Sequence, residues 1–206
     1  MFAAGFHTTR SGYLSTVNGD DELEELDEDS LHDSEALPTS RPNPIVIAAS
    51  VTARGGVLWV PVAGLLALAG KKKTAKRALT AAAVAMPVGH LISLVVHRQR
   101  PPAATMPARQ ALPEHPDSSS FPSKHAVTAA AFGTATALDD RTAAVFVTPL
   151  VLLVAYSRLR TRVHWPTDVL GGLAIGAAVA LAQAGIGRSA KARATARRLA
   201  AIVTRV

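Results

Sequence analysis

The chain contains no cysteine and few aromatic residues. The absence of cysteine excludes disulfide bonds, zinc-thiolate sites and thiol catalysis. Aromatic residues make up only 4% of the 206 residues and charged residues only 18%, whereas hydrophobic residues make up 49%. Because Ala, Val and Leu dominate this apolar content, the composition favours helices.

The apolar residues form long blocks rather than a stripe along one helix face, which is the pattern of helices surrounded by lipid. The sequence therefore predicts an all-α, polytopic transmembrane bundle of about five spans. The predicted spans are residues 45–69, 78–96, 121–138, 143–156 and 169–186. The first is interrupted by Arg54 and Pro61, and the third and fourth fall short of the roughly 20 helical residues that cross a bilayer core.

Polar segments flank the apolar blocks. Residues 1–43 contain no sustained apolar run and hold most of the acidic residues, so we predict a disordered acidic tail there. The chain does not open with a basic start and an apolar run, and we therefore expect no cleaved signal peptide. The membrane-embedded domain is expected to cover residues 44–187, followed by a basic C-terminal tail at residues 188–206.

The basic residues cluster between the apolar blocks. The net charge of +7 is therefore better explained by anionic headgroups or phosphate than by nucleic acid. If all five segments cross, loop 71–77, turn 139–141 and the C-terminal tail share one side, which the positive-inside rule makes cytoplasmic. Loops 97–120 and 157–168 then lie on the outer face of the plasma membrane, although both carry arginines.

Three polar clusters lie at the predicted outer ends of the spans. They read HRQRPP at residues 97–102, FPSKH at 121–125 and SRLRTRVHWPTD at 157–168. Alone, the first could anchor headgroups and the second could simply begin a helix. In the third, a helix beginning near Pro166 would let Asp168 accept an imidazole N–H from His164, leaving the other nitrogen as a nucleophile or base. A polar pair at the membrane interface is the alternative.

Together the clusters resemble the three-part signature of the type 2 phosphatidic acid phosphatases, KxxxxxxRP, PSGH and SRxxxxxHxxxD. The corresponding segments here are SLVVHRQRP, PSKH and SRLRTRVHWPTD, in the same order and at the same helix ends. The third segment matches at every fixed position, and the resemblance covers roughly residues 45–186. The vanadate-dependent haloperoxidases share the logic of this signature, but they are soluble.

The resemblance implies a metal-independent lipid phosphatase that needs no cofactor, with catalytic loops at one membrane face. His164 would attack phosphorus, Asp168 would orient it, and His125 would protonate the departing oxygen and then activate water. The substrate-binding residues would be Arg100, Ser123, Lys124, Ser157 and Arg158.

Two positions depart from the signature. Ser93 stands where the first motif has lysine, which removes a cation at the phosphate, and Lys124 replaces the glycine of the second motif. We hypothesise that the Lys124 ammonium partly restores the missing charge. The alternatives are that Lys124 simply faces water, or that these losses make the protein slow or inactive.

The expected partners are the lipid bilayer and a membrane lipid phosphate, such as undecaprenyl diphosphate or a phosphatidate-like lipid. A phosphotransferase that passes the phosphoryl group from the same histidine to an alcohol is a second possibility. A non-catalytic, degenerate lipid-binding member is a third. His90, within the second predicted span, is expected to be a buried polar residue satisfied by a neighbouring helix, with substrate contact as the alternative. The sequence leaves the lipid and the oligomeric state open.

Overall fold

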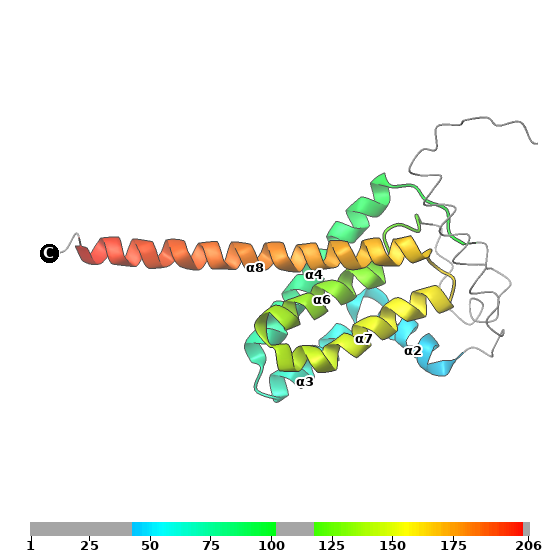
Figure 1. Cartoon of the computed structure of the whole chain (residues 1–206), viewed down its shortest axis with the longest axis horizontal. Helices are drawn as coiled ribbons and strands as arrows, with labels where there is room; N and C mark the ends of the chain where they lie inside the picture. The colour runs from blue at the N-terminus through cyan, green and yellow to red at the C-terminus, as the bar shows by residue number, and fades with distance from the viewer. Residues whose placement is uncertain (1–42, 102–117, 204–206) are drawn as a thin grey trace, which may run out of the picture. The chain divides into compact units, whose positions relative to one another are not determined.

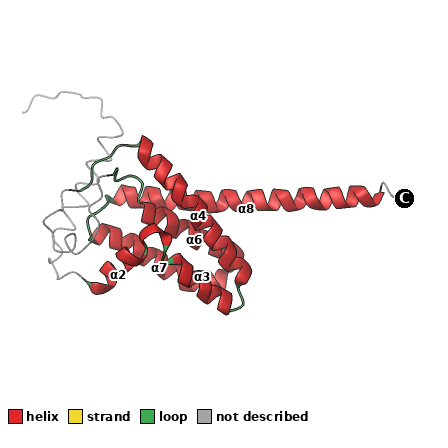
Figure 2. Cartoon of the chain, turned by 180° about the vertical axis from the view of Figure 1, so that it is seen from behind, coloured by secondary structure: helices red, strands yellow, loops and turns green. Residues whose placement is uncertain are grey.

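The computed structural model describes residues 43–101 and 118–203, and within these ranges it contains helices, turns and loops but no strand (Figures 1 and 2). The elements are α2 (Pro44–Thr52), the short 3-10 helix η1 (Arg54–Gly56), α3 (Trp59–Leu68), α4 (Lys72–Val95), α6 (Lys124–Asp139), α7 (Arg141–Arg160) and α8 (Pro166–Val203). The all-α prediction is confirmed. The predicted acidic tail lies outside the described residues except for Asn43, whereas helix α8 continues through most of the predicted basic tail.

Three helices are long and apolar enough to cross a membrane. They are α4, α7 and the Pro166–Ala190 part of α8, with 24, 20 and 25 residues. Helices α2 and α3 form a fourth span only if the pair, bent by 64°, is counted as one. The third predicted span is helical, but α6 has 16 residues and is about 24 Å long, less than the ~30 Å of a bilayer core. By length and composition the described residues thus give three to four candidate spans.

Two consecutive glycines break the first predicted span. Gly55 and Gly56 have φ values of 59° and 76°, a region that glycine occupies without the steric penalty of a Cβ. The amide of Leu58 still donates to the Thr52 carbonyl at 2.9 Å across this break. The bend therefore interrupts the apolar stretch at Arg54.

Helix α6 is the central helix of the bundle, packed against α4, α7 and α8 (Figure 1). Its contact with α8 is close because α8 presents glycines there. A Cβ on Gly176 would lie 2.1 Å from the Val127 carbonyl oxygen, and one on Gly172 would lie 2.8 Å from that of Ser123. Small residues that permit such backbone approach are typical of membrane helix pairs.

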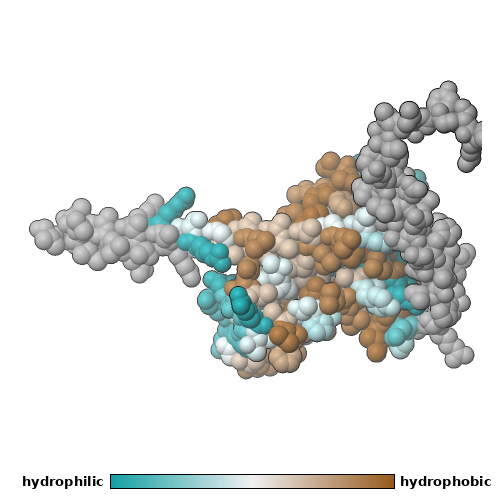
Figure 3. Space-filling view, viewed as in Figure 1, coloured by the Kyte–Doolittle hydropathy of each residue, from teal (hydrophilic) through white to brown (hydrophobic). Residues whose placement is uncertain are grey.

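The outer surfaces of the helices are apolar. Leu68 is 86% exposed and Phe146 is 74% exposed. Figure 3 shows hydrophobic residues over much of the visible face of the bundle. Inside, Trp59 of α3 stacks on Phe132 of α6 with ring centroids 4.8 Å apart. An apolar exterior around a packed interior is what a lipid-embedded bundle requires.

Ion pairs gather at the end of the bundle where α4 begins and α6 ends. Lys71 pairs with Asp140 and Arg77 with Asp139, while Thr74 Oγ1 donates to Asp139 at 2.8 Å. Arg188 lines a cavity of about 240 Å³ together with Arg77 and Asp139. Loop 71–77, turn 139–141 and the start of the basic tail therefore meet at one end, as the sequence predicts.

Candidate active site

The three sequence clusters meet where α4 ends and where α6 and α8 begin. The amide of Ser120 donates to the Arg98 carbonyl at 2.9 Å, and that of Ser123 donates to the Asp168 carbonyl at 3.0 Å. Arg100 Nη1 donates to the Val163 carbonyl at 2.6 Å. These hydrogen bonds bring together segments that are far apart in the sequence.

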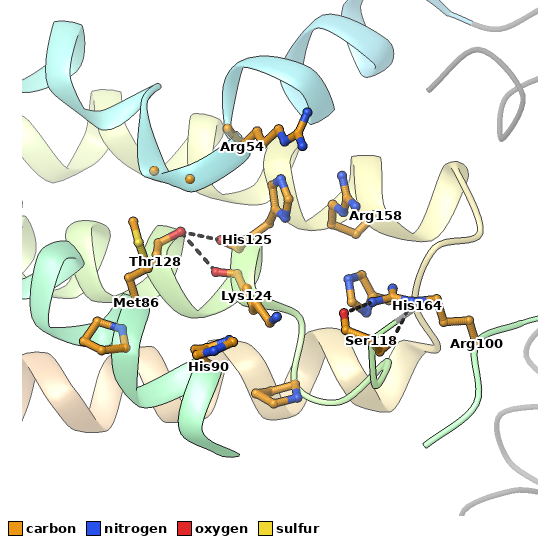
Figure 4. Close-up of a pocket in the computed structure, with 15 residues that line it drawn as sticks. Arg54, Met86, His90, Arg100, Ser118, Lys124, His125, Thr128, Arg158 and His164 are labelled. Atoms are coloured by element: carbon orange, nitrogen blue, oxygen red, sulfur yellow. Dashed lines mark hydrogen bonds between the residues drawn. The ribbon is translucent and has the colours of Figure 1, made fainter. Parts of the chain in front are cut away.

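A cavity of about 460 Å³ opens at this junction (Figure 4). Five of the eight predicted site residues line it, namely Arg100, Lys124, His125, Arg158 and His164. The other three, Ser123, Asp168 and Ser157, are buried behind it and do not line it. The predicted residues therefore divide into a set that faces the cavity and a set that lies behind it.

His164 lies in the loop between α7 and α8 and is only 5% exposed. Its Nδ1 is 2.7 Å from the backbone carbonyl oxygen of Ser120. Because a carbonyl oxygen only accepts, Nδ1 carries the hydrogen and Nε2 keeps its lone pair. Burial lowers the pKa of His164 to about 4; the nearby Asp168 opposes this shift, and the Arg158 and Arg100 cations add to it. The ring is therefore neutral at neutral pH.

Asp168 does not make the hydrogen bond that the sequence predicts. Its Oδ2 lies 3.7 Å from His164 Nδ1, which is too long for a hydrogen bond. The carboxylate instead accepts from Arg98 Nη1 and from the Trp165 amide, both at 2.9 Å. Asp168 therefore holds the loop and places a negative charge near the imidazole, while the Ser120 carbonyl is the direct partner of the ring.

Two arginines face the cavity from different elements. Arg158, in the last turn of α7, is 1% exposed, and its Nη1 donates to the hydroxyl of Ser50 in α2. Arg100 donates to the backbone carbonyls of Ser118, Ser119 and Val163. These hydrogen bonds fix the direction of the Arg100 guanidinium beside the cavity. The pair forms a cationic wall suited to an anion.

The beginning of α6 supplies further polar groups at the cavity. Ser123 is the N-cap residue, and Lys124 and His125 form the first turn. Within the described part of the chain, the buried Oγ of Ser123 and Nε2 of His125 have no hydrogen-bond partner. Exposed amides at a helix N-terminus and unpaired polar atoms beside a cavity both favour a polar ligand.

Two serines named by the sequence motifs do not reach the cavity. Ser157 donates its hydroxyl to the Val154 carbonyl at 2.7 Å, so it is satisfied within its own helix. Ser93, in the position of the family lysine, likewise donates to the His90 carbonyl at 2.7 Å. Ser157 and Ser93 therefore do not line the cavity.

Sequence reasoning gave no site role to three residues found here, and it weighed a fourth, His90, only as an alternative. Arg98 binds Asp168, Ser50 binds Arg158, and Arg54 and His90 line the cavity. His90 is exposed, contrary to the expected buried position. An arginine and a histidine within apolar blocks were the available signals for Arg54 and His90. A serine hydroxyl in α2 gave no such signal.

Within residues 43–101 and 118–203, no group of three His, Asp or Glu side chains could hold a metal ion.

Known proteins resemble this chain in sequence and in fold. The model of the PAP2 superfamily matches residues 74–187, which include all three clusters. Decaprenylphosphoryl-5-phosphoribose phosphatase of Mycobacterium tuberculosis is 36% identical over 126 residues, covering 60% of this chain and 67% of that protein. A match of this extent shows shared family membership.

A solved structure shows the same fold. It is described as the first transmembrane PAP2-type phosphatidylglycerolphosphate phosphatase, from Bacillus subtilis, and aligns with a TM-score of 0.62 over 82% of this chain and 88% of its own. Its identity is 19%, so it supports the architecture alone. From the family match, the phosphatase relative and the apolar helices, the chain belongs to the PAP2 superfamily and is a membrane phosphoric ester hydrolase.

Proposed function

We propose that this protein hydrolyses a polyprenyl-linked phosphate through a phosphohistidine intermediate on His164. The observation that carries the proposal is the hydrogen bond between His164 Nδ1 and the Ser120 carbonyl, 2.7 Å long. It leaves a neutral imidazole with the Nε2 lone pair available, on a side chain that lines the cavity. That is the form in which histidine is a nucleophile.

The phosphoryl group would lie among Arg100, Arg158 and the first turn of α6. Phosphoryl transfer spreads negative charge over the equatorial oxygens, so fixed cations and amides stabilise its transition state. The unpaired Ser123 hydroxyl, buried at the N-cap, is a further donor. Ser123 lies behind the residues that line the cavity. A phosphoryl oxygen therefore has to come close to the first turn of α6 to accept a hydrogen bond from this hydroxyl.

His125 is proposed as the general acid. As the Nε2–P bond forms on His164 and the P–O ester bond breaks, the departing alkoxide takes a proton from His125. His125 then accepts a proton from water, which attacks phosphorus and releases phosphate with His164 restored. The unpaired Nε2 of His125 lies on the same cavity, within reach of a departing oxygen. Burial and the Arg158 cation lower the pKa of His125, so the proposed role requires the anionic substrate to favour the protonated ring.

Lys124 is proposed to supply the charge that the family lysine would give. Ser93 is bonded within α4 and does not line the cavity, whereas Lys124 does. A Lys ammonium is a mobile point charge that can approach a phosphoryl oxygen from several rotamers. The position of Lys124 on the cavity supports the hypothesis that its ammonium replaces the missing charge at position 93, rather than the alternative that it faces water.

The proposed substrate has a polar headgroup larger than one phosphate. The cavity extends past the reaction residues to Arg54, Met86 and His90. In Figure 4, Arg54 and His90 lie on opposite sides of His125. Its volume of about 460 Å³ falls in the range of small-molecule sites, roughly 300–1,000 Å³. The relative named as a phosphatase of decaprenylphosphoryl-5-phosphoribose suggests a lipid-linked sugar phosphate.

The site is proposed to face the outside of the plasma membrane. The end of the bundle that holds loop 71–77 carries the lysine cluster, and the positive-inside rule assigns such an end to the cytoplasm. The active site lies where α4 ends, at the other end of that helix. A reporter at the C-terminus is expected to read cytoplasmic, and an extracellular signal would contradict the orientation.

The test is phosphate release by the purified, detergent-solubilised protein. Three substrates should be compared: a polyprenyl-phosphoryl sugar phosphate, undecaprenyl diphosphate and phosphatidate, each with chelator present. We expect release that is fastest on the first substrate and abolished in His164→Ala. Release that persists in that variant would contradict the mechanism. Preference for phosphatidate would contradict the substrate, and phosphorylation of an added alcohol would favour the phosphotransferase.

A further inference from the structure

Arg98 is connected to His164 by two separate routes. Its Nη1 donates to Asp168 Oδ1 at 2.9 Å and to Thr167 Oγ1 at 2.6 Å. Its carbonyl oxygen accepts from the Ser120 amide at 2.9 Å, and the Ser120 carbonyl in turn accepts from His164 Nδ1 at 2.7 Å. One route is a side-chain ion pair, and the other runs through the backbone.

The surroundings of the Arg98 guanidinium favour arginine over other cations. Its central carbon lies 5.6 Å from the centre of the Trp165 ring, within the range of a cation–π contact. The Trp165 indole donates to the Gln99 carbonyl at 2.9 Å, and its amide donates to Asp168 at 2.9 Å. A fully buried carboxylate such as Asp168 needs a paired charge, and Arg98 supplies it.

Arg98 does not line the cavity, whereas Arg100 does. The two arginines of the HRQRP segment therefore have different surroundings. Arg100 faces the space for a substrate, and Arg98 faces the loop that carries the nucleophile. Of these two arginines, only Arg100 is accordingly assigned a role in binding the phosphoryl group.

We propose that Arg98 is a positioning residue for phosphoryl transfer: its guanidinium holds the Asp168 carboxylate and the loop that carries His164, while its main chain, which side-chain variants keep, holds the Ser120 segment. The inference rests on the proposed role of His164 as nucleophile. Misplacing a reacting group by about 1 Å costs roughly 100-fold in rate. Because Arg98 does not face the substrate, its loss acts on kcat rather than on KM.

The pH dependence of kcat/KM distinguishes a positioning role from a general loss of packing. Loss of packing predicts no particular direction of shift in the acid limb. The charged and titratable groups that face His164 are Arg100, His125, Arg158 and Asp168. Removing Arg98 leaves the Asp168 carboxylate without its cation, so the carboxylate raises the pKa of His164 more strongly. The acid limb of kcat/KM then moves toward neutral pH.

The experiment compares Arg98→Ala and Arg98→Lys with wild type in the detergent-solubilised full chain. His97→Ala, at the exposed neighbouring residue, is the matched control. Arg98→Ala is expected to lower kcat roughly 100-fold at unchanged KM and to shift the acid limb upward. Arg98→Lys is expected to recover part of the loss in kcat and part of the shift of the acid limb, since an ammonium can still pair with Asp168. If Arg98→Ala does not fold, Arg98→Lys alone provides the test.

Two results would overturn the inference while leaving the proposed function intact. One is an unchanged kcat and acid limb in both Arg98 variants, and the other is a rise in KM alone. Failure of the proposed function is recognised separately, by a wild-type protein that releases no phosphate or by a His164→Ala variant that keeps its activity.

Discussion

The imidazole Nδ1 of His164 is hydrogen-bonded to the main-chain carbonyl of Ser120 at 2.7 Å, while Asp168 Oδ2 lies farther away at 3.7 Å. A backbone acceptor fixes the tautomer whatever the side chain at position 120 is, because every residue presents a carbonyl. The hydrogen bond that sets the His164 tautomer is therefore separable from the Asp168 carboxylate in this protein.

Asp168→Asn tests whether the Asp168 carboxylate is needed to set the His164 tautomer. We expect a loss of kcat of roughly 100-fold, because the loop loses one acceptor for the Trp165 amide while the Ser120 carbonyl still holds the tautomer. The comparison is with His164→Ala, which removes the proposed nucleophile. A loss of roughly 10,000-fold, the size seen where a carboxylate alone sets the tautomer, would contradict this reading.

The pH dependence follows from the pKa of His164, which is lowered to about 4 by burial. The unfolded chain binds a proton on this residue near pH 6.5, so between about pH 6.5 and 4 the unfolded state holds more protons and stability falls as pH falls. The loss amounts to about 3 kcal/mol. The measurement is thermal unfolding of wild type and His164→Ala at pH 7 and at pH 4.5. The stability of His164→Ala relative to wild type should be higher at pH 4.5 than at pH 7. A constant difference would contradict the assignment.

Lys124 is tested by separating its charge from its size. Lys124→Gln should lower kcat/KM roughly 10-fold, equal to about 1.4 kcal/mol, whereas Lys124→Arg should keep most of it. Phosphate release at low ionic strength is the measurement. Equal activity in wild type and Lys124→Gln would show that the ammonium does not compensate for Ser93.

Arg54 lines the cavity on the side away from His164 in Figure 4 and is expected to bind the polar headgroup. Arg54→Ala should raise KM for a polyprenyl-phosphoryl sugar phosphate by several-fold, on the order of 1 kcal/mol, and leave phosphatidate turnover nearly unchanged. Arg141→Ala, at the start of α7, is the matched loss of charge. An equal rise in KM for both substrates would contradict the role of Arg54 in binding the headgroup.

Gly176 tests the packing of α8 on α6. A Cβ there would lie 2.1 Å from the Val127 carbonyl oxygen, so Gly176→Ala has to push the helices apart. We expect a loss of roughly 1–3 kcal/mol and a lower Tm in detergent. Gly185→Ala is the matched control, since nothing lies within 4 Å of its added Cβ. Similar Tm values for the two variants would contradict the close approach.

The sequence predicted the helical class and five of the residues that line the cavity, because both depend on local patterns. Apolar blocks define membrane helices, and the HRQRP, PSKH and SRLRTRVHWPTD segments carry their chemistry in side chains. The Ser120 carbonyl could not be predicted in this way, since a backbone acceptor is set by tertiary contacts and leaves no mark in residue type.

Other differences also come from tertiary packing. The bend at Gly55 turns a weak span into two short helices and brings Arg54 to the cavity, although its charge gave only a general signal. Ser157 fits the motif spacing, yet its hydroxyl bonds within α7. Helix α6 has the composition of a span, but it is short and lies at the centre of the bundle.

The central claim is covalent catalysis by His164, and trapping the intermediate tests it most directly. Wild-type protein mixed with a polyprenyl-linked phosphate labelled at phosphorus, then quenched within milliseconds at alkaline pH, should carry acid-labile phosphate that peptide mass spectrometry assigns to His164. His164→Ala should carry none. Label on another residue, or rapid turnover by wild type with no trapped label at any quench time, would contradict the account.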